Sequence, residues 1–174
     1  NSLEPDEKIV EFYNKVYNAE KKEFNGEMLR IEDKWILNKL NKLIKDITKL
    51  IEDYDLGIAL DKIYNFIWNE FCDWYIELSK ARLYDKENVR PRKVAQYVLG
   101  YVLEHTLRLL HPFMPFITEE IYTKLYNNDE SIMISKWPEY DNNLNYEKEI
   151  QAVEELKNII IGIRNIRVQR NVHP

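Results

Sequence analysis

The sequence has little of what builds several common classes of protein. A single cysteine, Cys72, in 174 residues excludes a disulfide framework and favours a reducing compartment. Only 4 glycines and 6 prolines leave little turn chemistry for an all-β fold, and so few glycines cannot build a phosphate-binding loop. No stretch approaches the roughly 20 consecutive apolar residues of a membrane span, and no signal peptide is recognisable at Asn1. We therefore expect a cytoplasmic, helical protein with no membrane partner.

What is present supports one well-filled core. Hydrophobic residues make up 45% of the chain and aromatic residues 13%, which argues against disorder. The formal net charge of −5 argues against a globally basic nucleic-acid binder. A local basic patch would still permit phosphate contacts, because these depend on where Lys and Arg cluster.

Apolar residues recur at helical spacing along most of the chain, which predicts an all-α fold. We expect an up-and-down helical bundle over residues 1–130, followed over 131–174 by a short extended link and an additional C-terminal helix. The helices are expected near residues 2–24, 31–54, 56–84, 89–110, 115–126 and 145–169. The third has apolar residues on all sides and is expected to be the most buried. On the last, Val153, Leu156 and Ile163 are expected to face inward.

The run LLHPFMPFITEEIY, residues 109–122, joins two of these helices. Pro112 should end the fourth helix near His111, and Pro115 suits the first turn of the fifth. The apolar residues between and beside the prolines, Met114 and Phe116 among them, predict a buried elbow. Farther on, the alternation within Ser131–Trp137 predicts a short extended segment.

No catalytic or metal-binding group is expected in this chain. His105, His111 and His173 have no metal-ligand spacing, and a structural role for His111 is the better interpretation. Glu119 and Glu120 are neighbours on a helix and point about 100° apart, so they do not form a catalytic carboxylate pair.

Two basic clusters are candidates for nucleic-acid contact, and a third, Arg164, Arg167 and Arg170 near the C-terminal end, is explained equally well by favourable placement at the end of a helix dipole. The first lies at the end of the first predicted helix, where helical spacing would place Lys15, Asn18 and Lys22 on one face. Cations, amides and an exposed aromatic ring could bind phosphate, read a base edge and stack on an unpaired base. The alternative is a solvated helix end. The candidate residues of both clusters are Asn14, Lys15, Asn18, Lys21, Lys22, Phe24, Arg90, Arg92 and Lys93.

Several motifs resemble one family. The elbow looks like the connector in the anticodon-binding domain of class I aminoacyl-tRNA synthetases for branched aliphatic amino acids. His-Pro-Phe-Met-Pro-Phe followed by Thr-Glu-Glu resembles the valyl-tRNA synthetase type, because relatives for leucine and isoleucine usually carry alanine at His111. Further similar runs occur in the same order: Asp33–Leu37, Trp68–Tyr75, Trp137-Pro138, Ile163–Arg167 and Asn171-Val172.

The resemblance implies a helical bundle that binds the anticodon stem and loop of a valine tRNA, attached to a catalytic domain that uses ATP and magnesium. The His-x-Gly-His and Lys-Met-Ser-Lys-Ser signatures of that catalytic domain are absent, so we expect an inactive fragment of a valine–tRNA ligase, with no cofactor of its own and monomeric. The alternatives are a free-standing tRNA-binding or protein-interaction module, and the corresponding domain of an isoleucine or leucine enzyme.

The resemblance also bears on single residues. Asn14–Ala19 is similar to a core of the family's first helix that supplies part of the anticodon-binding surface, and Lys15 matches the family's lysine. The chain departs from the family at Lys21 and Lys22, where Arg-Phe is common, and at Val10-Glu11, where Arg-Asn is usual. Phe24 is the nearest aromatic residue that could replace the missing stacking ring.

Overall fold

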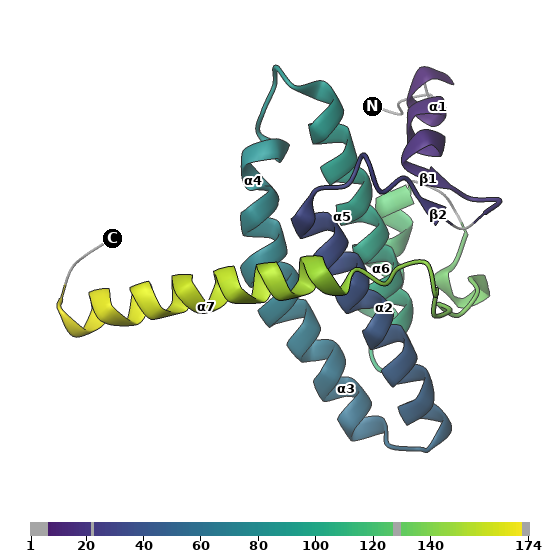
Figure 1. Cartoon of the computed structure of the whole chain (residues 1–174). Coiled ribbons are helices and arrows are strands. Elements are labelled where there is room, and N and C mark those ends of the chain that lie inside the picture. The colour runs from purple at the N-terminus through teal and green to yellow at the C-terminus, as the bar shows by residue number, and fades with distance from the viewer. Residues whose placement is uncertain (1–6, 22, 127–129, 172–174) are drawn as a thin grey trace.

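The computed structural model describes residues 7–21, 23–126 and 130–171. Its α-helices are α1 (Glu7–Val16), α2 (Ile31–Glu52), α3 (Leu56–Asn65), α4 (Glu77–Leu83), α5 (Val89–Leu110), α6 (Pro115–Tyr126) and α7 (Glu147–Gln169). A π-helical stretch, η1 (Phe66–Ile76), joins α3 to α4, and a short 3-10 turn, η2 (Ile132–Ile134), follows α6. Strands β1 (Tyr17–Asn18) and β2 (Glu23–Phe24) pair antiparallel. The expected all-α fold is confirmed (Figure 1).

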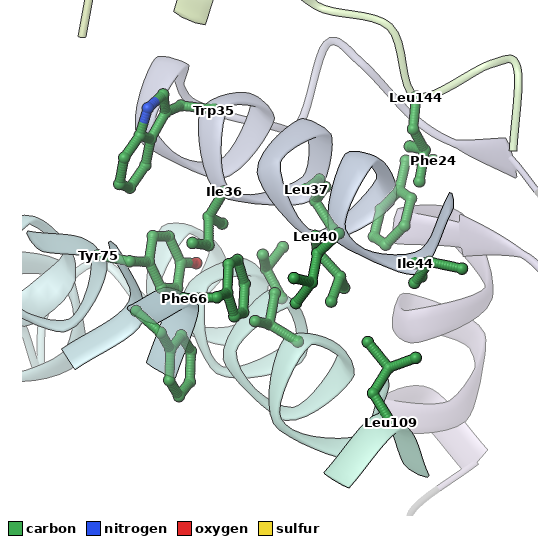
Figure 2. Close-up of a cluster of buried hydrophobic side chains, with 14 of the residues drawn as sticks. Phe24, Trp35, Ile36, Leu37, Leu40, Ile44, Phe66, Tyr75, Leu109 and Leu144 are labelled. Carbon is green, nitrogen blue, oxygen red and sulfur yellow. The ribbon is translucent and has the colours of Figure 1, made fainter. Parts of the chain in front are cut away.

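The core is built around α2, which packs against α3, η1, α5 and α7. Its inner side chains, among them Ile36, Leu37 and Leu40, meet residues from several other elements in one cluster (Figure 2). The prediction that the third helix is the most buried is wrong, since Tyr64 and Trp68 on this helix are 59% and 52% exposed. The rod from α3 through η1 to α4 buries one face against α2 and α5 and leaves the other in solvent.

The elbow between α5 and α6 begins and ends where the prolines predict, but it is not buried. Phe116 is 90% exposed and Met114 is 49% exposed, so that prediction is wrong. The bend is held by polar contacts instead. The Thr118 hydroxyl donates to the Met114 carbonyl at 2.8 Å and lies 2.7 Å from Nδ1 of His111. Because the Thr118 hydroxyl proton is donated to Met114, the Nδ1–H of His111 is the donor in the bond between His111 and Thr118. This agrees with the expected structural role of His111.

The link after α6 forms a turn rather than an extended segment, so the prediction for Ser131–Trp137 is wrong at its centre. The Glu119 carboxylate accepts hydrogen bonds from the Ser131 hydroxyl and from the backbone N–H of Ile132, at 3.0 and 3.2 Å. The Ser131 hydroxyl oxygen accepts in turn from the backbone N–H of Met133. These bonds wind the chain into η2, and Ile132 is buried against Leu107 and Tyr122.

Helix α7 crosses the bundle and its C-terminal half extends away from it (Figure 1). Val153 is buried as expected, but Leu156 and Ile163 are 45% and 53% exposed, which contradicts the expected inner face. Lys157 takes the inner position: it is 7% exposed, and its ammonium group lies 4.9 Å from the ring centre of Trp35. Cation–π contact and an ion pair of 2.8 Å with Glu70 make this buried charge tolerable.

Candidate nucleic-acid interface

The first helix is shorter than the sequence predicts. It ends at Val16, and the paired strands β1 and β2 (the hairpin) follow it instead of a further helical turn. Tyr17 pairs with Phe24, and Asn18 pairs with Glu23. The start of the helix expected at residues 2–5 lies outside the described residues, and so does Lys22. The proposed face shared by Lys15, Asn18 and Lys22 is therefore wrong as a helical face, because Asn18 belongs to a strand.

The hairpin nevertheless brings most of the first cluster together. A polar cavity of about 390 Å³ lies between α1 and the hairpin. The predicted residues that line this cavity are Asn14, Lys15, Asn18, Lys21 and Phe24. The Asn18 side chain also shapes the turn, since its Oδ1 accepts a hydrogen bond from the Lys21 backbone N–H at 3.0 Å. Glu23 and Glu27 line the same cavity, so its charge is mixed.

Phe24 is not the exposed stacking ring that the sequence suggests. It is only 5% exposed and its ring packs 4.8 Å from Tyr17 and 5.0 Å from Tyr101, measured between centroids. Tyr97 completes this group at 6.2 Å from Phe24. The role of Phe24 here is to fix the hairpin on α5, because aromatic pairs at these separations are stabilising.

A second cavity connects the two predicted basic clusters. It has a volume of about 580 Å³, and its cationic lining residues are Lys15, Arg90 and Lys93. Among the described residues that line it there is no carboxylate, so this lining favours an anion. Lys93 lies 5.7 Å from the ring centre of Phe12. Arg92 is not part of this surface: its Nη1 donates to the backbone carbonyl of Asp85 at 3.3 Å.

Lys15 lines both cavities and is therefore the centre of the candidate interface. Its ammonium group forms an exposed ion pair of 2.6 Å with Glu11. That contact lowers the pKa of Glu11, chiefly through the hydrogen bond from Lys15 and then through its charge. The lysine is held in place by a carboxylate that a phosphate group could replace.

Sequence reasoning missed the aromatic residues that support this surface. Tyr13 and Tyr17 are four residues apart, and so are Tyr97 and Tyr101. The rings of Tyr13 and Tyr97 lie 5.2 Å apart, and those of Tyr17 and Tyr101 lie 5.7 Å apart. The spacing of four was the available signal, and it does place Tyr97 and Tyr101 on one side of α5, whereas Tyr17 lies in β1.

Within residues 7–21, 23–126 and 130–171, no group of three or more His, Cys, Asp or Glu side chains could hold a metal ion. In the same ranges no helix is long and apolar enough to cross a membrane.

Comparison with known proteins agrees with the expected resemblance. The chain is 48% identical to the valine–tRNA ligase of Fervidobacterium nodosum over 92% of the chain and 19% of that relative. The corresponding enzyme of Thermotoga maritima is 46% identical, again over 92% and 19%. That of Geobacillus stearothermophilus is 40% identical over 99% of the chain and 21% of the relative. The chain thus spans about a fifth of the length of the curated relatives it matches.

The model of one family, described as the anticodon-binding domain of tRNA ligase, matches residues 33–174. These residues include most of α2, the rod from α3 to α4, the elbow and α7. The chain belongs to the family of anticodon-binding domains of tRNA ligases.

Proposed function

We propose that this chain binds the anticodon stem and loop of a valine tRNA, and that it does so as part of a longer valine–tRNA ligase. The observation that carries the proposal is the position of Lys15, where an amide-lined cavity meets a cavity lined by cations. Amide side chains can hydrogen-bond to the edges of unpaired bases, and cations can bind the adjoining phosphates.

In that longer protein the domain would position the tRNA for aminoacylation with valine. ATP and magnesium would be used by the catalytic domain of the same polypeptide, and the chain described here would do no chemistry. We propose a cytoplasmic, monomeric protein. The exposed apolar side chains of the elbow, Phe116 above all, support a contact with the rest of the polypeptide, because large exposed apolar side chains mark interaction sites.

The direct test is binding of the chain to RNA hairpins whose anticodon ends in AC, compared with hairpins of scrambled loop sequence. We expect salt-dependent binding, because most of the affinity comes from phosphate contacts, and tighter binding of the AC loop. Lys15→Ala should weaken binding by about 1–3 kcal/mol. It should also reduce the slope of the logarithm of the binding constant against the logarithm of the salt concentration (the salt slope) by about one.

Lys62→Ala is the matched control, since Lys62 also forms an exposed ion pair of 2.6 Å, with Asp46, but lies on α3. It should bind like the unmodified chain. Equal affinity for all loops would contradict discrimination by this domain. Equal effects of Lys15→Ala and Lys62→Ala would contradict the location of the interface.

A further inference from the structure

A groove on the other side of the hairpin is not used by the interface described above. It lies between α5 and the segment that follows η2, and its volume is about 240 Å³. The residues that define it are Tyr17, Tyr101, His105, Arg108, Lys136 and Trp137. They come from three separate parts of the chain and combine aromatic rings with cations.

The aromatic side chains of this groove are held in fixed positions. The rings of Tyr101 and His105 stack with centroids 4.0 Å apart and planes inclined by 27°. His105 Nδ1 donates to the Tyr101 carbonyl at 2.9 Å, which leaves Nε2 as an acceptor. Trp137 is 36% exposed, and its indole N–H donates to the Thr48 hydroxyl at 2.9 Å. Rigid, partly exposed rings are good surfaces for stacking a base.

The groove also carries the charges that a nucleotide requires. Lys136 is exposed, and its ammonium group has no ion-pair partner among the residues that the structure describes. Arg108 lies beside it, bound to Glu104 and to the backbone carbonyl of Lys136. Glu139 and Asp141 line the same groove and could accept hydrogen bonds from the amino group of a base. Cations for a phosphate and acceptors for a base edge therefore occur together.

This groove adjoins the interface around Lys15. Phe24 lines the amide cavity on one side of the hairpin, and its ring contacts Tyr17 and Tyr101, which line the groove on the other. One layer of aromatic side chains separates the two sites. Successive nucleotides of one single-stranded loop could occupy both.

We propose that this groove binds a second unpaired nucleotide of the RNA loop, with its base stacked on Trp137 and its phosphate on Lys136. The proposal rests on the proposed function, since it assigns a second site to the same RNA. A groove of about 240 Å³ is smaller than a typical pocket for a drug-sized ligand and has room for one base. Its cations and partly exposed rings favour a nucleotide over an apolar peptide.

The test measures affinity of the full 174-residue chain for the AC-ending hairpin by fluorescence anisotropy. Trp137→Ala should weaken binding about tenfold, because a base stacked on an aromatic ring contributes an effect of that order. Trp137→Phe keeps a ring and should bind within about twofold of the unmodified chain. Lys136→Ala should reduce the salt slope by about one. Trp68→Ala is the matched control, since Trp68 is also exposed but lies on η1.

A second measurement distinguishes a direct contact from a change in fold. Each loop nucleotide is replaced in turn by an abasic residue, and the hairpins are bound to the unmodified chain and to Trp137→Ala. At one loop position the abasic residue should lower the affinity of the hairpin for the unmodified chain about tenfold. The same abasic residue should hardly change its affinity for Trp137→Ala, because both changes remove the same stack. For Lys15→Ala, the loop position at which the two losses of affinity do not add should be a different nucleotide. Circular dichroism melts show whether each variant is folded.

The groove proposal is overturned if Trp137→Ala binds like the unmodified chain, as it would if the groove held a peptide. It is also overturned if the loss from Trp137→Ala adds to every abasic substitution, or if Trp68→Ala causes the same loss. These results leave the Lys15 interface standing. Failure of the unmodified chain to bind the hairpin overturns the proposed function together with the groove.

Discussion

Arg82 on α4 donates two hydrogen bonds to the carboxylate of Asp33 on α2, at 2.8 and 2.6 Å. The two side chains are 4% and 0% exposed. The Tyr75 hydroxyl donates to the same carboxylate at 2.8 Å. Burial raises the pKa of Tyr75 well above its ordinary value, and the nearby Asp33 carboxylate adds to this. The network fixes the first turn of α2 to the rod that forms the other side of the bundle.

Asp33→Ala should therefore lower the free energy of unfolding by about 3 kcal/mol, because the buried Arg82 guanidinium then keeps only its ion pair of 3.0 Å with Glu32 and the Tyr75 hydroxyl loses its acceptor. Urea denaturation followed by circular dichroism measures the change. Lys80→Ala breaks the exposed pair of Lys80 with Glu77 on the same helix and should leave the midpoint unchanged. Equal losses in both variants would contradict the special role of the buried pair.

The two ends of the elbow should respond differently to truncation. Leu109 is fully buried, so Leu109→Ala should lower the free energy of unfolding by about 2–5 kcal/mol. Phe116 is 90% exposed, so Phe116→Ala should change it by less than about 0.5 kcal/mol. Urea denaturation of both variants checks this, and a large loss for Phe116→Ala would mean that the ring is buried in solution.

These residues also show what the sequence could and could not predict. The boundaries at Ile31, Val89 and Pro115 follow from apolar periodicity and proline position, which act locally, and they agree with the structure. The exposure of Phe116 could not be predicted. An apolar run indicates that a surface tends to leave water, but the fold of the whole polypeptide decides what covers it.

The hairpin was missed for a related reason. Helical spacing continues past Val16 to Ala19, so the sequence favours a longer helix. Tertiary contacts reverse that preference, because Tyr17 and Phe24 gain ring contacts with residues of α5 only if the chain turns back. The candidate residues nevertheless lie together, since the hairpin places Asn18 and Lys21 in the same cavity as Lys15.

Stability should fall in mild acid because of His105. Burial lowers the pKa of its imidazole below the ordinary 6.5. The charge of Glu104 and the hydrogen bond to the Tyr101 carbonyl oppose this less strongly, and the charge of Arg108 adds the smallest lowering effect. The unfolded chain then binds more protons than the folded chain once the pH drops through 6.5. This contribution to stability is complete above that pH and is lost as the pH falls toward the lowered value.

The measurement is urea denaturation between about pH 5.5 and 7.5 for the unmodified chain and for His105→Gln, since 6.5 lies in that window. Glutamine can still donate to the Tyr101 carbonyl but does not titrate. As the pH falls, the free energy of unfolding of the unmodified chain should decrease relative to that of His105→Gln. A difference that stays constant over this range would show that His105 does not titrate differently in the folded and unfolded chains.

Removing the carboxylate of Glu11 should strengthen RNA binding. Glu11 holds the ammonium group of Lys15 at 2.6 Å, so a phosphate must compete with it and is also repelled by it. Glu11→Gln keeps the side-chain size, removes the charge and should tighten binding of the AC-ending hairpin by roughly two- to fivefold at low salt, mainly through faster association. The gain should disappear at high salt, where exposed charges are screened. Asp46→Asn frees Lys62 from an equally short pair between α2 and α3 and should have no such effect. A similar gain from Asp46→Asn would mean that only net charge matters, and an unchanged affinity of Glu11→Gln would place the phosphate away from Lys15.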